Sequence, residues 1–412
     1  MERIEALGQI SEEQGRLTRT YGSAAMRRAN DLAGSWMREA EMETRQDAVG
    51  NLIGHYARRG QETGDRSQEK GAEQKILLLG SHLDTVRDAG KFDGPLGVLT
   101  AIACVEELRA SERRLPFALE VVGFADEEGV RFHTGYLGSK ALAGGLSEED
   151  LKRKDATGVT LAQAISSFGG RPEALEGARL DPKRLLGYVE VHIEQGPVLE
   201  QKHLAVGVVS AIAGQTRVKL TSTGRAGHAG ATPMDLRRDA LCAAAEFVLA
   251  AEKLAQSRNG LVATVGEITA LPGASNVIPG EARLSLDVRH AEDAVRQAAM
   301  EELENRAAAI AAQRKVSVDW QHVHQTAAVR CDRRLSALLG EAVKRHQPEL
   351  VLLPSGAGHD AAAMAAVTPV AMLFVRCKGG LSHHPEESAS VEDVRVAIAV
   401  MNDFIQLVAQ DA

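Results

Sequence analysis

The sequence predicts an α/β fold in which a mixed, mostly parallel sheet with helices on both faces is interrupted by a second, smaller domain. Three observations predict it. Short apolar runs alternate with segments of helical periodicity, as in parallel sheets buried on both faces. His, Asp and Glu residues follow the ends of several of these runs. The chain has 412 residues, which exceeds the roughly 250–300 at which single cores stop growing, so two domains are expected.

The first elements follow from apolar spacing. Residues 23–42 carry apolar side chains at helical intervals, with Ser23 as the expected N-cap. Residues 57–74 are polar and charged, and we expect an exposed loop there. The run ILLL at 76–79 predicts a strand that is buried on both faces and stops at Gly80. The next elements expected are a helix at 98–110 and strands at 117–126 and 187–192.

The segment from 216 to 324 has its own order of elements. It predicts a strand at 216–222, a helix at 235–254, strands at 261–268 and 282–289, a helix at 292–314 and a strand at 315–323. This β-α-β-β-α-β order is the ferredoxin-like motif. Helix and strand then alternate again through 335–346, 350–353, 359–366, 369–376 and 391–409. We therefore expect one domain from 1–212 and 328–412, split by an inserted domain at 213–327.

Composition excludes several classes of partner. The net charge is -8 and there is no Lys/Arg block, which argues against nucleic acid and anionic membranes. No apolar run approaches the roughly 20 residues of a membrane span, and the N-terminal segment lacks a signal-peptide core. The four cysteines are scattered, which suits reduced thiols. A cytoplasmic protein is expected.

Metal-binding residue types follow four of the expected strands. In an open α/β sheet the carboxyl ends of parallel strands meet at one edge, where sites form. Imidazoles and carboxylates at such an edge predict a divalent metal centre. The alternative is that they only solvate loops, but four strand ends bearing these residues favour the metal centre. The candidates are His82 and Asp93, Glu127 and Glu128, His192, and His383.

The spacing of these residues suggests separate roles. A pair of metal ions needs a bridging carboxylate, and we interpret Asp93 as the bridge. Asp84 shares a face with His82 two residues earlier, so its carboxylate is expected to accept a hydrogen bond from the second imidazole nitrogen. Glu127 and Glu128 are adjacent, which favours one as a ligand and the other as the base that accepts a proton from water.

Five strings in the chain carry a family resemblance. They are GSHLDTV at 80–86, FDG at 92–94, EEGVRF at 127–132, HIEQGP at 192–197 and SH at 382–383. With these strings, nearly the whole chain resembles the dinuclear metal-dependent amidohydrolases of the hydantoinase/carbamoylase group, in the M20 metallopeptidase-like family. That group includes allantoate amidohydrolases, N-carbamoyl-L-amino-acid amidohydrolases and β-ureidopropionases. The resemblance implies a zinc-exopeptidase-like catalytic domain.

The resemblance also implies ligand sets and roles. One ion would be bound by His82, Asp93 and His192. The other would be bound by Asp93, Glu128 and His383, with Glu127 as general base. A histidine at 192, where related peptidases use a carboxylate, points to the ureido-cleaving branch. The ligand types suit Zn or Mn, with Co or Ni as alternatives.

Further roles are implied for the strings GHAGATPM at 227–234, NVIPG at 276–280 and DVR at 287–289, which by themselves are turns. Arg289 resembles a bidentate clamp for a substrate carboxylate, Asn276 a carboxylate or ureido contact, and His228 an oxyanion stabiliser. Gln195 and Gln215 resemble further substrate contacts. The resemblance also implies a homodimer formed through the inserted domain, with His228 delivered to the partner's site. It further implies that the inserted domain acts as a lid that closes over the substrate.

The expected activity is hydrolysis of a ureido C–N bond in a small carboxylate-bearing substrate. Strings such as SAIAGQTR at 210–217 most resemble chains assigned to allantoate cleavage, which releases ammonia and CO2. The alternatives are an N-carbamoyl-L-amino acid and β-ureidopropionate. Outside enzymes, an inactive metal-loaded binding protein is the remaining interpretation. The intact Glu127 counts against it, because a metal site that only binds needs no base.

Overall fold

The computed structural model describes residues 1–57, 74–113 and 115–411, so the loop expected at 57–74 lies almost wholly outside the described residues. The chain forms two compact units. The first consists of Met1–Ser210, Cys331–Leu353 and Ala357–Ala412, and the second of Ala211–Arg330 with Pro354–Gly356. The second unit thus begins and ends within a few residues of the expected insertion. Its roles as a lid and as a dimerisation domain stay predictions.

The first unit is built on a mixed sheet whose central strands are parallel. β3 lies between β4 and β5, β5 also pairs with β15, and all three pairs are parallel. β2 and β6 flank these strands in antiparallel pairs. In spatial order the strands are β1 (Glu43–Gln46), β2 (Leu52–Tyr56), β4 (Ala118–Phe124), β3 (Ile76–His82), β5 (Leu185–Ile193), β15 (Val370–Val375) and β6 (Val206–Ile212). At β6, the short strands β13 (Val329–Arg330) and β14 (Leu352–Ser355) also pair.

Strand β3 is longer than its apolar run predicts. It does not stop at Gly80 but continues through His82, which pairs with Phe124 of β4. Gly80 permits this close pairing, because a Cβ there would lie 2.1 Å from the carbonyl oxygen of Val122. His82 is therefore held by the sheet itself and not by a loop.

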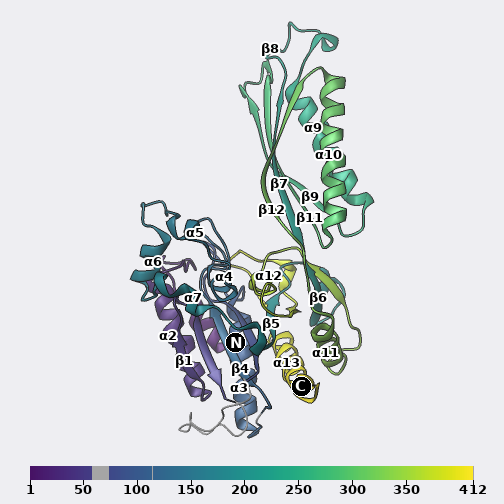
Figure 1. The fold of residues 1–412 in the computed structure, drawn as a ribbon. Helices are drawn as coiled ribbons and strands as arrows, with labels where there is room; N and C mark the ends of the chain where they lie inside the picture. The colour runs from purple at the N-terminus through teal and green to yellow at the C-terminus, as the bar shows by residue number, and fades with distance from the viewer. Residues whose placement is uncertain (58–73, 114, 412) are drawn as a thin grey trace. The chain divides into compact units, whose positions relative to one another are not determined.

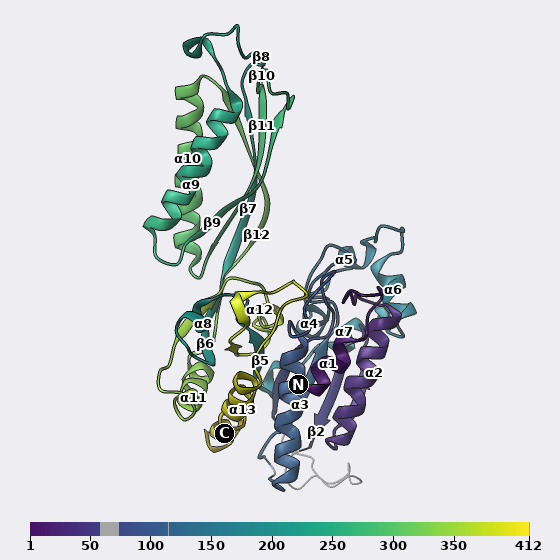
Figure 2. The same ribbon diagram turned by 180° about the vertical axis from the view of Figure 1, so that it is seen from behind.

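Helices cover both faces of this sheet. One row contains α2 (Ala24–Glu39), α3 (Pro95–Ala110), α13 (Val391–Asp411) and α11 (Arg333–Lys344), whereas α4 (Leu137–Ala143) and α12 (Asp360–Met364) pack together elsewhere on β4 and β5. In Figure 1 the viewer looks from the side of α4, and in Figure 2, seen from behind, α3 lies in front of the sheet. The side chain of Ser23 accepts the Met26 N–H, which confirms the expected N-cap of α2. The shorter helices are α1 (Glu2–Gly8), α5 (Glu148–Lys152), α6 (Leu161–Ser167), α7 (Leu175–Ala178) and α8 (Val198–Gln201).

The second unit is a four-stranded antiparallel sheet with α9 and α10 packed along one face (Figure 1). Its elements follow the expected β-α-β-β-α-β order, although α9 begins at Ala240 because the Asp239 side chain caps the Cys242 N–H. The elements in chain order are β7 (Gly214–Thr223), α9 (Ala240–Ser257), β9 (Val262–Leu271), β11 (Glu281–His290), α10 (Asp293–Arg314) and β12 (Ser317–Thr326). The small pair β8 (Gly227–His228) and β10 (Val277–Ile278) lies beside them.

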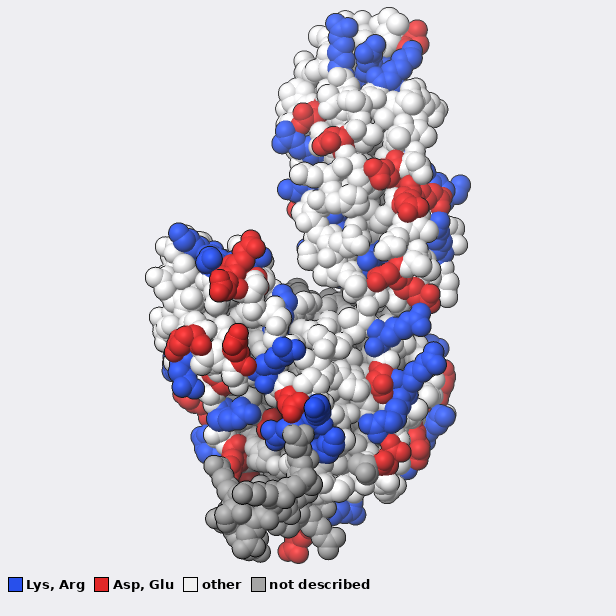
Figure 3. All heavy atoms as spheres, viewed as in Figure 1, with Lys and Arg blue, Asp and Glu red and all other residues white. Residues whose placement is uncertain are grey.

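On the face of the first unit in Figure 3, basic and acidic side chains are interspersed. Among the helices that the structure describes, none combines the length and the apolar character that crossing a membrane requires.

Candidate metal centre

The structure brings the expected metal ligands together at the carboxyl edge of the sheet. His82 ends β3, His192 lies near the end of β5, and Asp93 lies in the turn before α3. Three sets of side chains each offer ligand atoms within 4.8 Å of one another. The sets are His82, Asp93 and His192; Asp93, Glu128 and His383; and His82, Glu127 and Glu128.

The two oxygens of Asp93 face different imidazoles. Oδ1 lies 3.0 Å from Nε2 of His192 and 3.5 Å from Nε2 of His82. Oδ2 lies 3.2 Å from Nε2 of His383, which is in turn 3.4 Å from Glu128 Oε1. This is the arrangement of a carboxylate that is shared between two adjacent sets of ligands.

The outer hydrogen bonds of His82 and His192 determine which ring nitrogen faces the cluster. Nδ1 of His82 lies 3.1 Å from the Asp84 carbonyl oxygen, and Nδ1 of His192 lies 2.9 Å from that of Ile193. A carbonyl only accepts, so Nδ1 carries the proton and Nε2 of the neutral ring presents a lone pair. Both lone pairs meet Asp93, which also only accepts. Acceptors that face one another need either a proton or a metal cation between them, and a divalent metal fits this donor set.

Carboxylates dominate the electrostatics of the cluster. Burial by itself lowers the pKa of His82, but neighbouring carboxylates outweigh burial and hold its pKa well above the ordinary value. Burial also lowers the pKa of His192, but contact with Asp93 outweighs burial and raises this pKa above its ordinary value. Contacts with Asp93 and Glu128 raise the pKa of His383 to about 10. A field that favours a proton on each ring also favours a metal cation in its place.

Glu127, the expected base, is 9% exposed and lies in a set with His82 and Glu128. Burial raises the pKa of its carboxyl group, and repulsion from Glu128 raises it further. A raised pKa is what a carboxylate needs if it is to hold a proton transiently near neutral pH.

Asp84 differs from its expected role. Asp84 Oδ1 is 3.5 Å from Nδ1 of His82, whereas the Asp84 carbonyl oxygen is 3.1 Å from the same nitrogen. The two carboxylate oxygens instead accept the backbone N–H groups of Glu127 at 3.0 Å and Glu128 at 3.1 Å. Asp84 therefore orients the turn that presents the two glutamates, and it supports His82 mainly through its backbone.

Gln195 also has a different environment from the one expected. Its side-chain nitrogen donates to Asp93 Oδ2 at 2.9 Å and to Ser382 Oγ at 3.0 Å. The amide thus contacts the bridging carboxylate, and a substrate contact through this nitrogen would have to compete with that bond. The substrate role of Gln195 stays a prediction.

The other expected substrate contacts lie in the second unit, in two separate groups. Gln215 and Arg289 lie opposite each other at one end of β7 and β11. His228 and Asn276 lie beyond the other end, where β8 pairs with β10. The strands between them span roughly 25 Å at about 3.3 Å per residue. The fold of a single chain therefore keeps these two groups apart.

Local bonds orient Arg289 and His228. The Arg289 guanidinium forms a bidentate pair with Asp287 at 2.9 and 3.0 Å, and it donates to the Gly356 carbonyl oxygen at 2.7 Å. Nδ1 of His228 accepts the N–H groups of Gly230 and Ala231, each at 3.2 Å. In the neutral ring the proton is therefore on Nε2, which makes that atom an outward donor.

Two buried groups, Glu190 and His359, lie behind the cluster, and Glu190 was not expected from the sequence. Glu190 is fully buried on β5, where it accepts from Ser81 at 2.8 Å and from the Ala361 N–H at 2.9 Å. The ring of His359 packs edge-on against His192, with centroids 4.5 Å apart. A glutamate inside the apolar strand GYVEVHI was the available signal for Glu190, because a buried charge requires partners.

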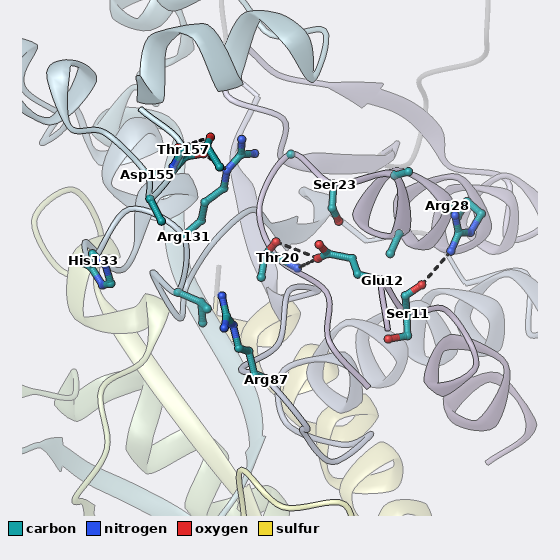
Figure 4. Close-up of a pocket in the computed structure, with 15 residues that line it drawn as sticks. Ser11, Glu12, Thr20, Ser23, Arg28, Arg87, Arg131, His133, Asp155 and Thr157 are labelled. Atoms are coloured by element: carbon teal, nitrogen blue, oxygen red, sulfur yellow. Dashed lines mark hydrogen bonds and ion pairs between the residues drawn. The ribbon is translucent and has the colours of Figure 1, made fainter. Parts of the chain in front are cut away.

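A separate pocket of about 770 Å³ opens on the first unit (Figure 4), and its walls contain none of the cluster residues. Its polar groups largely bond to one another. Arg131 donates to Asp155 at 2.9 Å and to the Tyr21 carbonyl oxygen at 2.9 Å, and Glu12 accepts from Thr20. Arg131 therefore joins the segment after Glu128 to the N-terminal region.

Comparisons with known proteins agree with this geometry. The sequence model of peptidase family M20/M25/M40 matches residues 78–407. The chain is 41% identical over 443 residues to a probable allantoate deiminase of Oryza sativa subsp. japonica, a match that covers 100% of this chain and 88% of that protein. It is 39% identical over 410 residues to an N-carbamoyl-L-amino acid amidohydrolase of Geobacillus stearothermophilus, covering 99% and 98% of the two chains.

A solved structure gives the same picture. The crystal structure of an amidase of the hydantoinase/carbamoylase family from Burkholderia multivorans superimposes with a TM-score of 0.89 at 30% identity. The superposition covers 98% of this chain and 95% of that one.

Proposed function

The chain belongs to peptidase family M20/M25/M40, and from this premise we propose that it hydrolyses a ureido C–N bond of a small carboxylate-bearing substrate, allantoate. The observation that carries the proposal is the shared carboxylate of Asp93 between two sets of ligands, with the buried Glu127 beside them. The substrate follows from the 41% identity with a protein named as an allantoate deiminase.

Two divalent ions fit the cluster, with Zn or Mn as the first candidates and Co or Ni as alternatives. His82, Asp93 and His192 would hold one ion, and Asp93, Glu128 and His383 the other. Such a pair supplies Lewis acidity and lowers the pKa of water when bound.

Glu127 moves the proton. As the general base it accepts a proton from the attacking water, and it then returns that proton to the departing nitrogen as the C–N bond breaks. The carbamic acid that remains then breaks down, so that ammonia and CO2 are released overall. The Asp84 carboxylate accepts hydrogen bonds from the Glu127 and Glu128 N–H groups and so fixes the turn that presents both side chains.

The substrate contacts of the second unit support a homodimer. His228 presents Nε2–H as a donor for a developing oxyanion, and Asn276 lies in the same corner. Arg289 binds the substrate carboxylate in competition with Asp287, beside Gln215. Because one chain separates these pairs along the sheet, we assign His228 and Asn276 to the partner's site and Gln215 and Arg289 to their own chain's site.

An N-carbamoyl-L-amino acid is the second candidate substrate. It is favoured by the 39% identity with an amidohydrolase of that name, of which the match covers 98%. β-Ureidopropionate is third, and an inactive metal-loaded protein is the alternative outside enzymes. The cytoplasmic location belongs to the same proposal and rests on the four cysteines, all of which are free.

A substrate panel tests the proposal. Protein reloaded with Mn or Zn is assayed for ammonia release from allantoate, from several N-carbamoyl-L-amino acids and from β-ureidopropionate. We expect the highest kcat/KM with allantoate. A higher kcat/KM with an N-carbamoyl-L-amino acid would overturn the assignment to allantoate and favour the second candidate. No ammonia release from any of the three substrates would refute the proposed hydrolysis.

A further inference from the structure

Glu387, a buried carboxylate outside the ligand sets, lies behind the bridging residue. It is 2% exposed. Its Oε1 accepts the backbone N–H groups of Phe92 at 2.8 Å and Asp93 at 3.0 Å. Its Oε2 lies 3.1 Å from the hydroxyl oxygen of Ser382. One side chain therefore joins the turn that carries Asp93 to the segment that carries His383.

Ser382 and Gln195 complete this network. The Ser382 hydroxyl donates to Asp93 Oδ2 at 2.7 Å, and the Gln195 amide donates both to that oxygen and to Ser382. Both contacts with Asp93 are made to Oδ2, the oxygen that faces His383. We call Gln195, Ser382 and Glu387 the Asp93 cradle.

The two ligand sets are supported differently. In the first set, His82 and His192 are buried and lie on strands β3 and β5. In the second set, the side chain of His383 is 49% exposed, and it lies on a segment outside helix and strand with a φ of 55°. Positive φ at a residue other than glycine persists only where the surroundings impose it. The sheet holds the two histidines of the first set in place, whereas His383 of the second set has no such support and depends on the cradle.

We propose that Glu387 is a positioning residue that holds Asp93 Oδ2 and the His383 segment in register, so that affinity for the second ion depends on it far more than affinity for the first. The inference rests on the two-ion centre proposed above. Groups that orient metal ligands commonly change metal affinity by roughly 10–100-fold when they are replaced. Loss of Glu387 should fall in that range for the second ion only.

Metal binding measured without substrate tests this. Apoprotein is titrated with Mn²⁺ in equilibrium dialysis, for the wild type, Glu387→Ala and Glu387→Gln. We expect two ions in the wild type and, in Glu387→Ala, a first ion within about threefold of wild type with a second ion at least roughly tenfold weaker. Glu387→Gln keeps an acceptor for the two N–H groups and should restore most of the second affinity.

Two further variants serve as checks. Glu386→Ala removes the adjacent, exposed glutamate and should bind both ions as the wild type does. Ser382→Ala removes the hydroxyl that lies between Glu387 Oε2 and Asp93 Oδ2, while Glu387 keeps the backbone N–H groups of Phe92 and Asp93. It should weaken the second ion alone. This variant keeps the test decisive if Glu387→Ala does not fold.

Three results would overturn the inference. They are wild-type affinity for both ions in Glu387→Ala and Ser382→Ala, an equal loss of both ions, and a wild type that binds a single ion. Failure of the proposed substrate is a separate matter, because the substrate panel can find another ureido compound while the binding titration still shows the selective loss.

Discussion

Glu127 is the proposed general base, and its raised pKa gives a testable pH dependence. The base must be ionised to accept a proton, so kcat/KM should rise with pH through a midpoint above 4.5, the ordinary value for a glutamic acid. Burial and repulsion from Glu128 are the causes of that shift. Glu127→Gln should remove the acid limb and lower kcat by roughly 10²–10⁴-fold.

The control for this prediction is metal content. Glu127→Gln should retain its ions, because we assign the ligand role to the neighbouring Glu128. A variant that loses activity together with its metal would identify Glu127 as a ligand, and one that keeps the wild-type rate would remove it from the mechanism.

At this scale the sequence predicted which side chains gather but not the partner of each. His82, Asp93 and His192 could be placed together because strand ends converge at one edge of a sheet. The bonds of Asp84, Gln195 and Glu387 could not be predicted, since each depends on a contact between segments far apart in the sequence. A buried Glu387 and a solvated Glu386 look the same in the string PEE.

Helix α3 shows how an element positions the centre. Gly97 lies where a Cβ would be 2.2 Å from the Val191 carbonyl oxygen and 2.7 Å from Ser81 Cβ, so α3 packs directly on the strands that carry His82 and His192. Gly97→Ala should destabilise the protein by about 1–3 kcal/mol or more, because the helix must move away from the sheet. Thermal or urea unfolding measures this.

Gly177 provides the matched control. It lies in helix α7, and among the described residues nothing beyond its chain neighbours and the helix backbone comes within 4 Å of an added Cβ. Gly177→Ala should therefore be neutral or stabilising by up to about 1 kcal/mol. If the two variants have the same free energy of unfolding, close packing of α3 at Gly97 does not support the ends of β3 and β5.

The elements themselves were largely predictable, because apolar runs and helical spacing report burial directly. Their ends were less so. β3 extends to His82 through backbone pairing that the run ILLL does not encode, and α3 begins early because Pro95 suits the first turn of a helix. The order in which β4, β3, β5 and β15 lie side by side is set by packing between distant segments, which no local pattern contains.

The dimer is the claim made at the scale of the whole molecule, and mixed subunits test it. If His228 acts in the partner's site, a dimer of one His228→Ala chain and one Glu127→Gln chain contains one intact site. Random pairing should then restore roughly a quarter of wild-type activity from two inactive variants. Co-expression with separate affinity tags, followed by the ammonia assay, measures this.

The matched control pairs Glu127→Gln with His383→Ala. Both residues belong to the first unit, so no mixed dimer contains an intact site and no activity should return. Restoration in neither pairing would mean that His228 serves its own chain or has no role in the reaction.

The central claim is that five side chains, His82, Asp93, Glu128, His192 and His383, converge on a pair of cations. Anomalous diffraction from crystals grown with Mn²⁺ tests it most directly. We predict two peaks about 3.5–4 Å apart, with Asp93 between them. A single peak, or peaks that lie away from Asp93, would contradict the account.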